Sequence, residues 1–92
     1  MQRVFYRIHT EDRHNLPAIV TFYFDCFAIW HGVGYWCGVG ENAACIDIIG
    51  TEEDHEKVQQ LAKFIKTANA QEAVYVTATP TTLFDIREEK HQ

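Results

Sequence analysis

The sequence lacks the cysteine pairs, long apolar runs and leader segment that mark several classes of protein. Its three cysteines, Cys26, Cys37 and Cys45, are an odd number and form no Cys-x-x-Cys pair, which argues against a structural zinc site and a disulfide scaffold. No segment approaches the roughly 18 apolar residues of a membrane span, and residues 1–7 lack the apolar core of a signal peptide. We therefore expect a cytoplasmic location, reduced thiols, no membrane partner, and no metal or other cofactor.

Positive charge is also scarce. The chain has 8 lysines and arginines against 13 aspartates and glutamates, for a net charge of −5. No basic stripe is present, so a nucleic acid is not an expected partner. The acidic balance first of all favours solubility, and it would also suit a basic protein partner.

The length and composition indicate one small globular domain. The chain has 92 residues, of which 47% are apolar and 23% charged, as is usual for a globular protein. We expect a single domain over residues 1–80, followed by an edge segment and charged tail over 81–92. A core of this size would gain stability from a second subunit.

Alternating side-chain character predicts four strands. Gly32 and Gly34 interrupt the second strand and predict a bulge or bend there. A turn is expected over residues 38–42, and Pro80 is expected to end the last strand. The predicted strands are residues 2–9, 26–30 with its resumption at 35–37, 43–49 and 72–79.

Two segments have helical periodicity, and their position defines the fold. Residues 16–24 and 51–69 repeat apolar side chains every three or four positions. Thr51 and Asp54 have the spacing of a capping box, and Asn69 is the expected left-handed residue at the end of the second helix. The order strand, helix, strand, strand, helix, strand is that of the ferredoxin-like α+β fold. We therefore expect a four-stranded antiparallel sheet with two helices on one face and its second and fourth strands at the edges.

The sheet face that the helices leave bare is the main indication of function. Its apolar surface is too large to stay in contact with water on a small monomer. We expect a second copy of the chain to cover it, since symmetric dimers are the commonest oligomers; a ligand, another protein or the segment that begins at Leu83 are the alternatives. The residues assigned to the helix side are Val4, Ile8, Ala44, Ile46, Ile48, Val74 and Val76. The residues assigned to the bare face are Phe5, Cys45, Ile49 and Tyr75, joined by Trp30 or Ile29 according to the register around the glycines.

Four short motifs accompany this pattern. They are Phe24-Asp25-x-Phe27, Gly34-Tyr35-Trp36, Glu41 before the third strand, and Gln71-Glu72-Ala73-Val74 at the start of the last. Over residues 3–79 the chain thereby resembles a group of small uncharacterised bacterial and phage proteins. The resemblance implies a single ferredoxin-like domain, and it implies no catalytic residue.

No catalytic set of side chains emerges from the sequence spacing. His31 is expected to be the most sheltered histidine, either as a structural side chain or as a base or metal ligand. The cysteines are expected to be buried and inert, with Cys37 the most accessible of them. The glycines at 32–40 precede a strand rather than a helix, so they do not form a phosphate-binding loop. No spacing brings together two of the carboxylates of Glu41, Asp47, Glu72 and Asp85.

A binding site is therefore better supported than a catalytic one. Arginines beside aromatic rings can hold a planar anionic ligand such as a nucleotide. The first hypothesis is a non-enzymatic homodimeric module that binds a small ligand or a protein, such as a phage or bacterial inhibitor. The alternatives are a cofactor-independent enzyme of the dimeric α+β-barrel type and an interaction through the acidic second helix. The expected binding residues are Arg3, Phe5, Arg7, Trp30, His31, Trp36 and Tyr75.

Overall fold

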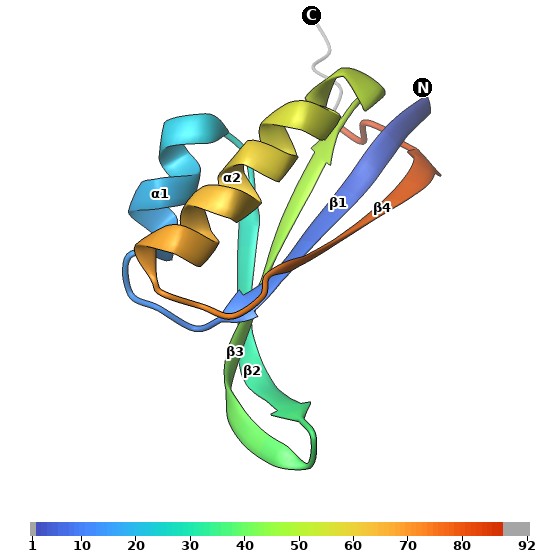
Figure 1. Cartoon of the computed structure of the whole chain (residues 1–92). Helices are drawn as coiled ribbons and strands as arrows, with labels where there is room; N and C mark the ends of the chain where they lie inside the picture. Colours follow the sequence, from blue (N-terminus) through green and yellow to red (C-terminus); the bar gives the residue numbers. More distant parts are fainter. Residues whose placement is uncertain (1, 88–92) are drawn as a thin grey trace, which may run out of the picture.

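The computed structural model describes residues 2–87, which form one sheet and two α-helices (Figure 1). Within them the four strands pair antiparallel in the order β2-β3-β1-β4, and both helices lie on one face of the sheet. The predicted ferredoxin-like α+β fold is confirmed, with the second and fourth strands at the edges. The elements are β1 (Gln2–Glu11), α1 (Leu16–Tyr23), β2 (Ala28–Trp36), β3 (Val39–Gly50), a 3₁₀ turn (Glu52–Asp54), α2 (His55–Ala68) and β4 (Tyr75–Thr82).

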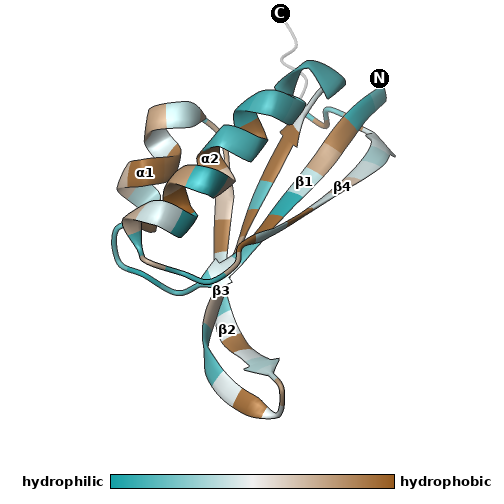
Figure 2. Cartoon of the chain, viewed as in Figure 1, coloured by the Kyte–Doolittle hydropathy of each residue, from teal (hydrophilic) through white to brown (hydrophobic). Residues whose placement is uncertain are grey.

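The core lies between the helices and the two central strands. Every second residue of β1 is buried from Val4 to Thr10, and β3 continues the same alternation from Ala44 to Ile48. Figure 2 shows hydrophobic bands on these strands and on the sides of the helices that face them. Because alternate strand residues point to opposite faces, the other half of these strands forms the sheet face opposite the helices, which we call the open face. The buried apolar residues are Val4, Tyr6, Ile8, Leu16, Val20, Ala44, Ile46, Ile48, Val58, Leu61, Ala62 and Ile65.

The start of the second helical segment confirms the predicted capping pair. The backbone N–H of Thr51 donates to Asp54 Oδ2 at 2.9 Å, and the Tyr6 hydroxyl donates to the carbonyl oxygen of Thr51 at 2.6 Å. At the other end the prediction was wrong: Asn69 has a φ of −107°, and the left-handed residue is Ala70, with a φ of 51°. No helix in residues 2–87 is long and apolar enough to cross a bilayer.

The β2–β3 hairpin differs from the prediction in both its turn and its strands. The register runs without a break from Ala28 opposite Asp47 to Trp36 opposite Val39, so Gly32 and Gly34 mark no bulge. The turn is Cys37-Gly38 rather than residues 38–42. Both have positive φ, 50° and 81°, as a two-residue type I′ turn requires. A cysteine at such a position gives little sequence signal, which explains the error.

The last strand was also predicted to end too early. Pro80 lies inside β4, opposite Val4, and an edge strand tolerates proline because one side of it has no partner. Val76, expected in the core, is 36% exposed. The segment Leu83–Ile86, expected as a short edge strand, has no regular structure. Residues 88–92 of the predicted charged tail lie outside the described residues.

The distal half of the β2–β3 hairpin extends past the rest of the sheet (Figure 1). The last pair that β1 makes with β3 is Glu11 with Ala43, so residues 33–42 have only each other as strand partners. We call these residues the arm and the remainder of the described chain the body. Unlike the body, the arm has no buried residue.

Candidate functional site

The open face carries the apolar residues that the sequence assigned to it. Directly paired residues of neighbouring strands lie on the same side of a sheet, and Phe5 pairs with Ile49 while His9 pairs with both Cys45 and Tyr75. Because the hairpin has no bulge, Trp30 pairs with Cys45 and joins this face. Ile29 points the other way and packs against the core. The choice that the sequence left open between Trp30 and Ile29 is thereby decided.

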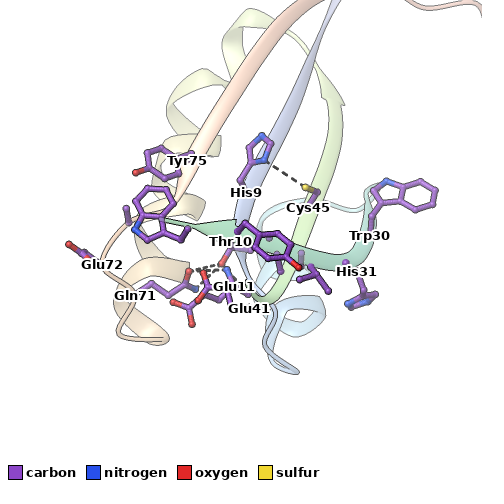
Figure 3. A pocket seen from close by; sticks show the side chains of 18 of the residues that line it. His9, Thr10, Glu11, Trp30, His31, Glu41, Cys45, Gln71, Glu72 and Tyr75 are labelled. Carbon is purple, nitrogen blue, oxygen red and sulfur yellow. Dashed lines mark hydrogen bonds between the residues drawn. The ribbon is translucent and has the colours of Figure 1, made fainter. Parts of the chain in front are cut away.

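A groove of about 750 Å³ lies where the arm leaves the body (Figure 3). Its walls come from the end of β1, the hairpin, and the connection from α2 into β4. This is the candidate site, and we call it the groove throughout. It is lined by His9, Thr10, Glu11, Trp30, His31, Gly32, Val33, Gly34, Tyr35, Trp36, Glu41, Ala43, Ala44, Cys45, Gln71, Glu72, Ala73, Tyr75 and Thr77.

Two aromatic side chains pack against each other in the wall of the groove. The rings of Trp36 and Tyr75 have centroids 5.7 Å apart and are inclined by 33°. Trp36 comes from the arm and Tyr75 from the first position of β4, which are opposite edges of the sheet. Both are about half exposed, at 54% and 50%. The arrangement offers flat apolar surfaces to a planar ligand.

A buried glutamine fixes the segment that leads into β4. Gln71 is 5% exposed. Its Nε2 donates to Thr10 Oγ1 at 2.7 Å, and its Oε1 accepts from the backbone N–H of Glu11 at 3.1 Å. These bonds tie the α2–β4 connection to the end of β1 (Figure 3). They thereby set the positions of the next residue, Glu72, and of Tyr75.

The groove is acidic. Glu11, Glu41 and Glu72 line it, and no lysine or arginine does. Glu11 is paired with the Arg13 guanidinium at 2.5 Å. Within residues 2–87, Glu41 and Glu72 form no ion pair. Glu41 and Glu72 therefore add negative charge to the lining of the groove that no ion pair within residues 2–87 offsets.

The predicted anion-binding arginines are not in the groove. Arg7 forms a bidentate pair with Asp47, with Nε 2.6 Å from Oδ1 and Nη2 2.8 Å from Oδ2. The Trp30 indole N–H also donates to Asp47 Oδ2, at 2.8 Å. The hydrogen bonds from Arg7 lower the pKa of the Asp47 carboxyl against the opposing effect of its partial burial, and the bond from Trp30 adds to this. Arg7 is thus committed to a carboxylate rather than available to an anion.

The other two predicted residues of this half of the sheet lie apart from the groove. Phe5 is beside Arg7, whose guanidinium carbon is 5.5 Å from its ring centroid. Arg3 lines a smaller hollow of about 460 Å³ at the start of β1, together with Glu52 and Glu53. The predicted set therefore divides in two: Trp30, His31, Trp36 and Tyr75 line the groove, while Arg3, Phe5 and Arg7 do not.

His31 and two of the cysteines are more exposed than expected. The His31 side chain is 65% exposed and its Nδ1 lies 3.0 Å from Asp12 Oδ2, so the prediction that it is sheltered was wrong. Cys26 and Cys37 are exposed, and only Cys45 is partly covered. Cys45 Sγ lies 3.7 Å from His9 Nδ1 in the wall of the groove. Within residues 2–87, no three His, Cys, Asp or Glu side chains are placed to hold a metal ion.

Several groove residues were not among the predicted site residues. Gln71 was noted in the sequence only as part of the motif that opens the last strand, and Glu72 was noted in that motif and among the carboxylates that no spacing brought together. His9 gave no signal and Cys45 was assigned only to the open face, because their proximity depends on the pairing of β1 with β3. Their common feature is a position next to a strand end or on the open face, which only the register reveals.

Comparison with known proteins identifies the fold and no family. No protein-family model matches the chain, and no curated protein matches its sequence. Among solved structures, a phage SAM lyase in complex with S-methyl-5'-thioadenosine has a TM-score of 0.58 and 21% identity, over 98% of this chain and 93% of that one. A phage SAM lyase in its apo state has a TM-score of 0.59 and 21% identity, over 99% of this chain and 94% of that one.

Two bacterial proteins have the same fold at lower identity. CPII, a nitrogen regulatory PII-like protein from Thiomonas intermedia bound to ADP, AMP and bicarbonate, has a TM-score of 0.60 and 14% identity, over 92% of this chain and 98% of that one. CutA from Synechococcus elongatus has a TM-score of 0.52 and 11% identity, over 86% of this chain and 77% of that one. At these identities the likeness shows a shared ferredoxin-like fold among small phage and bacterial proteins.

Proposed function

We propose that this protein is a small-molecule-binding module whose groove takes an uncharged or cationic adenine nucleoside. The observation that carries the proposal is an aromatic groove whose lining includes carboxylates without an ion-pair partner in residues 2–87 and includes no lysine or arginine. This differs from the planar anion expected from Arg3 and Arg7. Arg7 is held by Asp47 and neither arginine lines the groove.

The aromatic walls supply the first part of the recognition. A base that stacks on Trp36 or Tyr75 would gain roughly 1–3 kcal/mol by displacing water from flat apolar surface. The 5.7 Å between the two ring centroids leaves no room for a base between them, so the base would lie against one ring or displace Trp36. The arm, which has no buried residue, can allow that movement at small cost.

Charge supplies the second part. Carboxylates accept hydrogen bonds from ribose hydroxyls and from an exocyclic amine, and they repel phosphate. A cationic group such as a sulfonium gains from the same carboxylates and from the faces of Trp30 and Trp36. Two of the solved neighbours are described with adenine-containing ligands, S-methyl-5'-thioadenosine in one and ADP with AMP in the other. The acidic groove of this chain favours a ligand of the first kind.

Isothermal titration with three compounds tests the proposal. We expect S-adenosylmethionine and S-methyl-5'-thioadenosine to bind at least about tenfold more tightly than AMP, a difference of about 1.4 kcal/mol. Trp36→Ala and Tyr75→Ala should each weaken binding about tenfold or more, while Phe84→Ala, which changes a side chain 77% exposed and outside the groove lining, should not. Tighter binding of AMP, or no binding of the three, would overturn the proposal.

Charge is tested separately by Glu72→Gln. This variant keeps the shape of the groove and removes one carboxylate. We expect this variant to weaken the binding of S-adenosylmethionine more than the binding of S-methyl-5'-thioadenosine, since only the first compound is a cation. Equal losses for the two compounds would contradict the electrostatic part of the proposal and leave the stacking part intact.

A second candidate function is an enzyme that cleaves S-adenosylmethionine, in which the substrate's own carboxylate displaces the sulfur to give S-methyl-5'-thioadenosine and homoserine lactone. Two observations favour it: groove carboxylates without ion-pair partners in residues 2–87, and the phage lyase that matches nearly the whole chain. Incubation with S-adenosylmethionine and chromatographic detection of S-methyl-5'-thioadenosine tests it. Product formation that depends on protein concentration and is lost in Glu72→Gln would establish the enzyme over the binding module. Ligand binding without product would exclude it.

A further inference from the structure

The two edge strands of the sheet differ in how they are protected. Natural edge strands discourage pairing with other chains by proline, charged side chains and short length. β4 contains Pro80. β2 spans Ala28–Trp36 and contains no proline and no aspartate, glutamate, lysine or arginine. A nine-residue, uncharged, aromatic edge is the kind that pairs with another strand.

The backbone groups on the outer side of β2 follow from the turn. In a hairpin closed by two residues, the flanking residues form a hydrogen-bonded pair, and bonded and non-bonded pairs then alternate. Trp36 and Val39 flank the turn. The N–H and C=O groups of Ile29, His31, Val33 and Tyr35 therefore point away from β3. Within residues 2–87, no other segment bonds to them.

We propose that the outer edge of β2 pairs antiparallel with β2 of a second copy of this chain, about a two-fold axis at Gly32. This register matches every outward-pointing residue with another. Ile29 lies opposite the partner's Tyr35, and His31 opposite the partner's Val33. Since each bonded pair exchanges two hydrogen bonds, the interface contains about eight.

The side chains on the open face fit this register. The non-bonded pairs of an antiparallel ladder bring side chains closest together. In this register Trp30 lies opposite the partner's Gly34, and Trp36 opposite the partner's Ala28. Each large ring thus meets a small residue, and Gly32 meets its own copy at the axis. A shift by two residues would instead oppose Trp30 to the partner's Trp36. Large-to-small matching favours a second copy of this chain over an unrelated strand.

The surface that such pairing covers is consistent with a weak dimer. Trp30, Tyr35 and Trp36 are 59%, 75% and 54% exposed, which is roughly 400 Å² of aromatic surface per chain. With backbone and smaller side chains, two strands would bury on the order of 1,000 Å² in total, at the lower end of specific interfaces. No charged side chain lies on the paired strands to oppose the approach. We therefore expect a dissociation constant on the order of micromolar.

A cysteine placed at the axis tests the register directly. A Cβ at Gly32 meets nothing within 4 Å, so Gly32→Cys fits the strand. Non-bonded pairs place Cα atoms about 4.5 Å apart, within the range of a disulfide. In a background of Cys26→Ser, Cys37→Ser and Cys45→Ser, Gly32→Cys should form a disulfide-linked dimer under mild oxidation, measured by intact mass. Val33→Cys is the matched control, because 33 and the partner's Val33 would be more than about 7 Å apart, too far to link.

A proline on the outer side tests the pairing without a cross-link. Val33→Pro removes one outward N–H and leaves the bonds to β3 in place, whereas Val33→Thr keeps the N–H. We expect the proline to weaken the dimer roughly ten- to hundredfold and the threonine to leave it nearly unchanged, by native mass spectrometry across concentrations. Circular dichroism of both variants checks that the fold persists. The proposal would be overturned if the parent protein were a monomer or a trimer. It would also be overturned if Gly32→Cys and Val33→Cys cross-linked equally in the background that lacks the three native cysteines.

Discussion

The body and the arm of this protein are built from the same two strands under different conditions. In the body, β3 is covered by helices on one face and flanked by β1 and β2, and its alternate residues Ala44, Ile46 and Ile48 are at most 2% exposed. In the arm, the continuation of β2 and β3 has no third strand and no helix. Val33, Tyr35 and Val39 are there 64–75% exposed. A similar apolar composition therefore builds a core in one region and a surface in the other.

The difference indicates that the apolar residues of the arm are not there to stabilise the fold. A two-stranded ribbon is marginal in water without further cover, so the apolar side chains of the arm contribute little to folding. We propose instead that they serve binding, of a ligand in the groove through Trp36 or of a second copy through the edge of β2. Both proposals thus use the arm together with residues of the body beside it.

The largest expected effect compares a core residue of β3 with an arm residue of the same strand. Ile46 is fully buried and Val39 is 68% exposed. Ile46→Ala should lower the free energy of unfolding by about 2–5 kcal/mol, because it leaves a cavity. Val39→Ala should change it by less than about 0.5 kcal/mol. Urea denaturation of the two variants measures both values. Similar losses would mean that the arm is part of the cooperative core.

A smaller effect is expected at the turn that closes the arm. Cys37 adopts a φ of 50°, which costs a residue with a side chain about 1–2 kcal/mol and costs asparagine less. Cys37→Asn should therefore stabilise the arm by up to about 1 kcal/mol. Hydrogen exchange of the arm amides should slow, while exchange in the body stays the same. Slower exchange throughout the body would show that the two regions unfold together.

The smallest effect concerns the base of the arm and depends on pH. Asp47 joins Arg7 of β1 to Trp30 of β2, and these bonds lower its pKa from the ordinary 3.8. A carboxyl with a lowered folded-state pKa stabilises the protein above its unfolded pKa, and loses that contribution as pH falls through the folded value. Asp47→Asn should thus be less stable than the parent at pH 7, and the gap should narrow below about pH 4. If the difference in stability between the variant and the parent did not change with pH, the ion pair between Arg7 and Asp47 would not be its cause.

The repeat of apolar side chains, every two residues in strands and every three or four in helices, was enough to predict the central strands and the two helices. Val4, Ile8, Ala44, Ile46 and Ile48 were assigned to the helix side, and all five are buried. This worked because a core-facing strand must repeat every two residues along its own sequence. The pattern failed in the hairpin and in β4, where both faces are exposed and no burial imposes a period. Of the bulge or bend expected at Gly32 and Gly34, the bulge is absent, and β4 continues past Pro80.

The candidate site was predicted only in part, for a related reason. Tyr75 was placed on the bare face, Trp30 was placed there as an alternative to Ile29, and Trp36 was named only among the expected binding residues. Glu72 and Gln71 were not, because a polar residue before a strand has many roles. Arg7 was expected to bind an anion, since the sequence could not show that Asp47 lies opposite it on β3.

The sequence alone determined the order of elements and the composition of the core, since both depend on periodicities that are local in the chain. The tertiary structure decided the site. Trp36 and Tyr75 are on opposite edges of the sheet, and they meet at 5.7 Å only because the arm continues beyond β1. Register and curvature arise from the packing of whole strands, and they decided which side chains border the groove and which backbone groups of β2 remain unpaired.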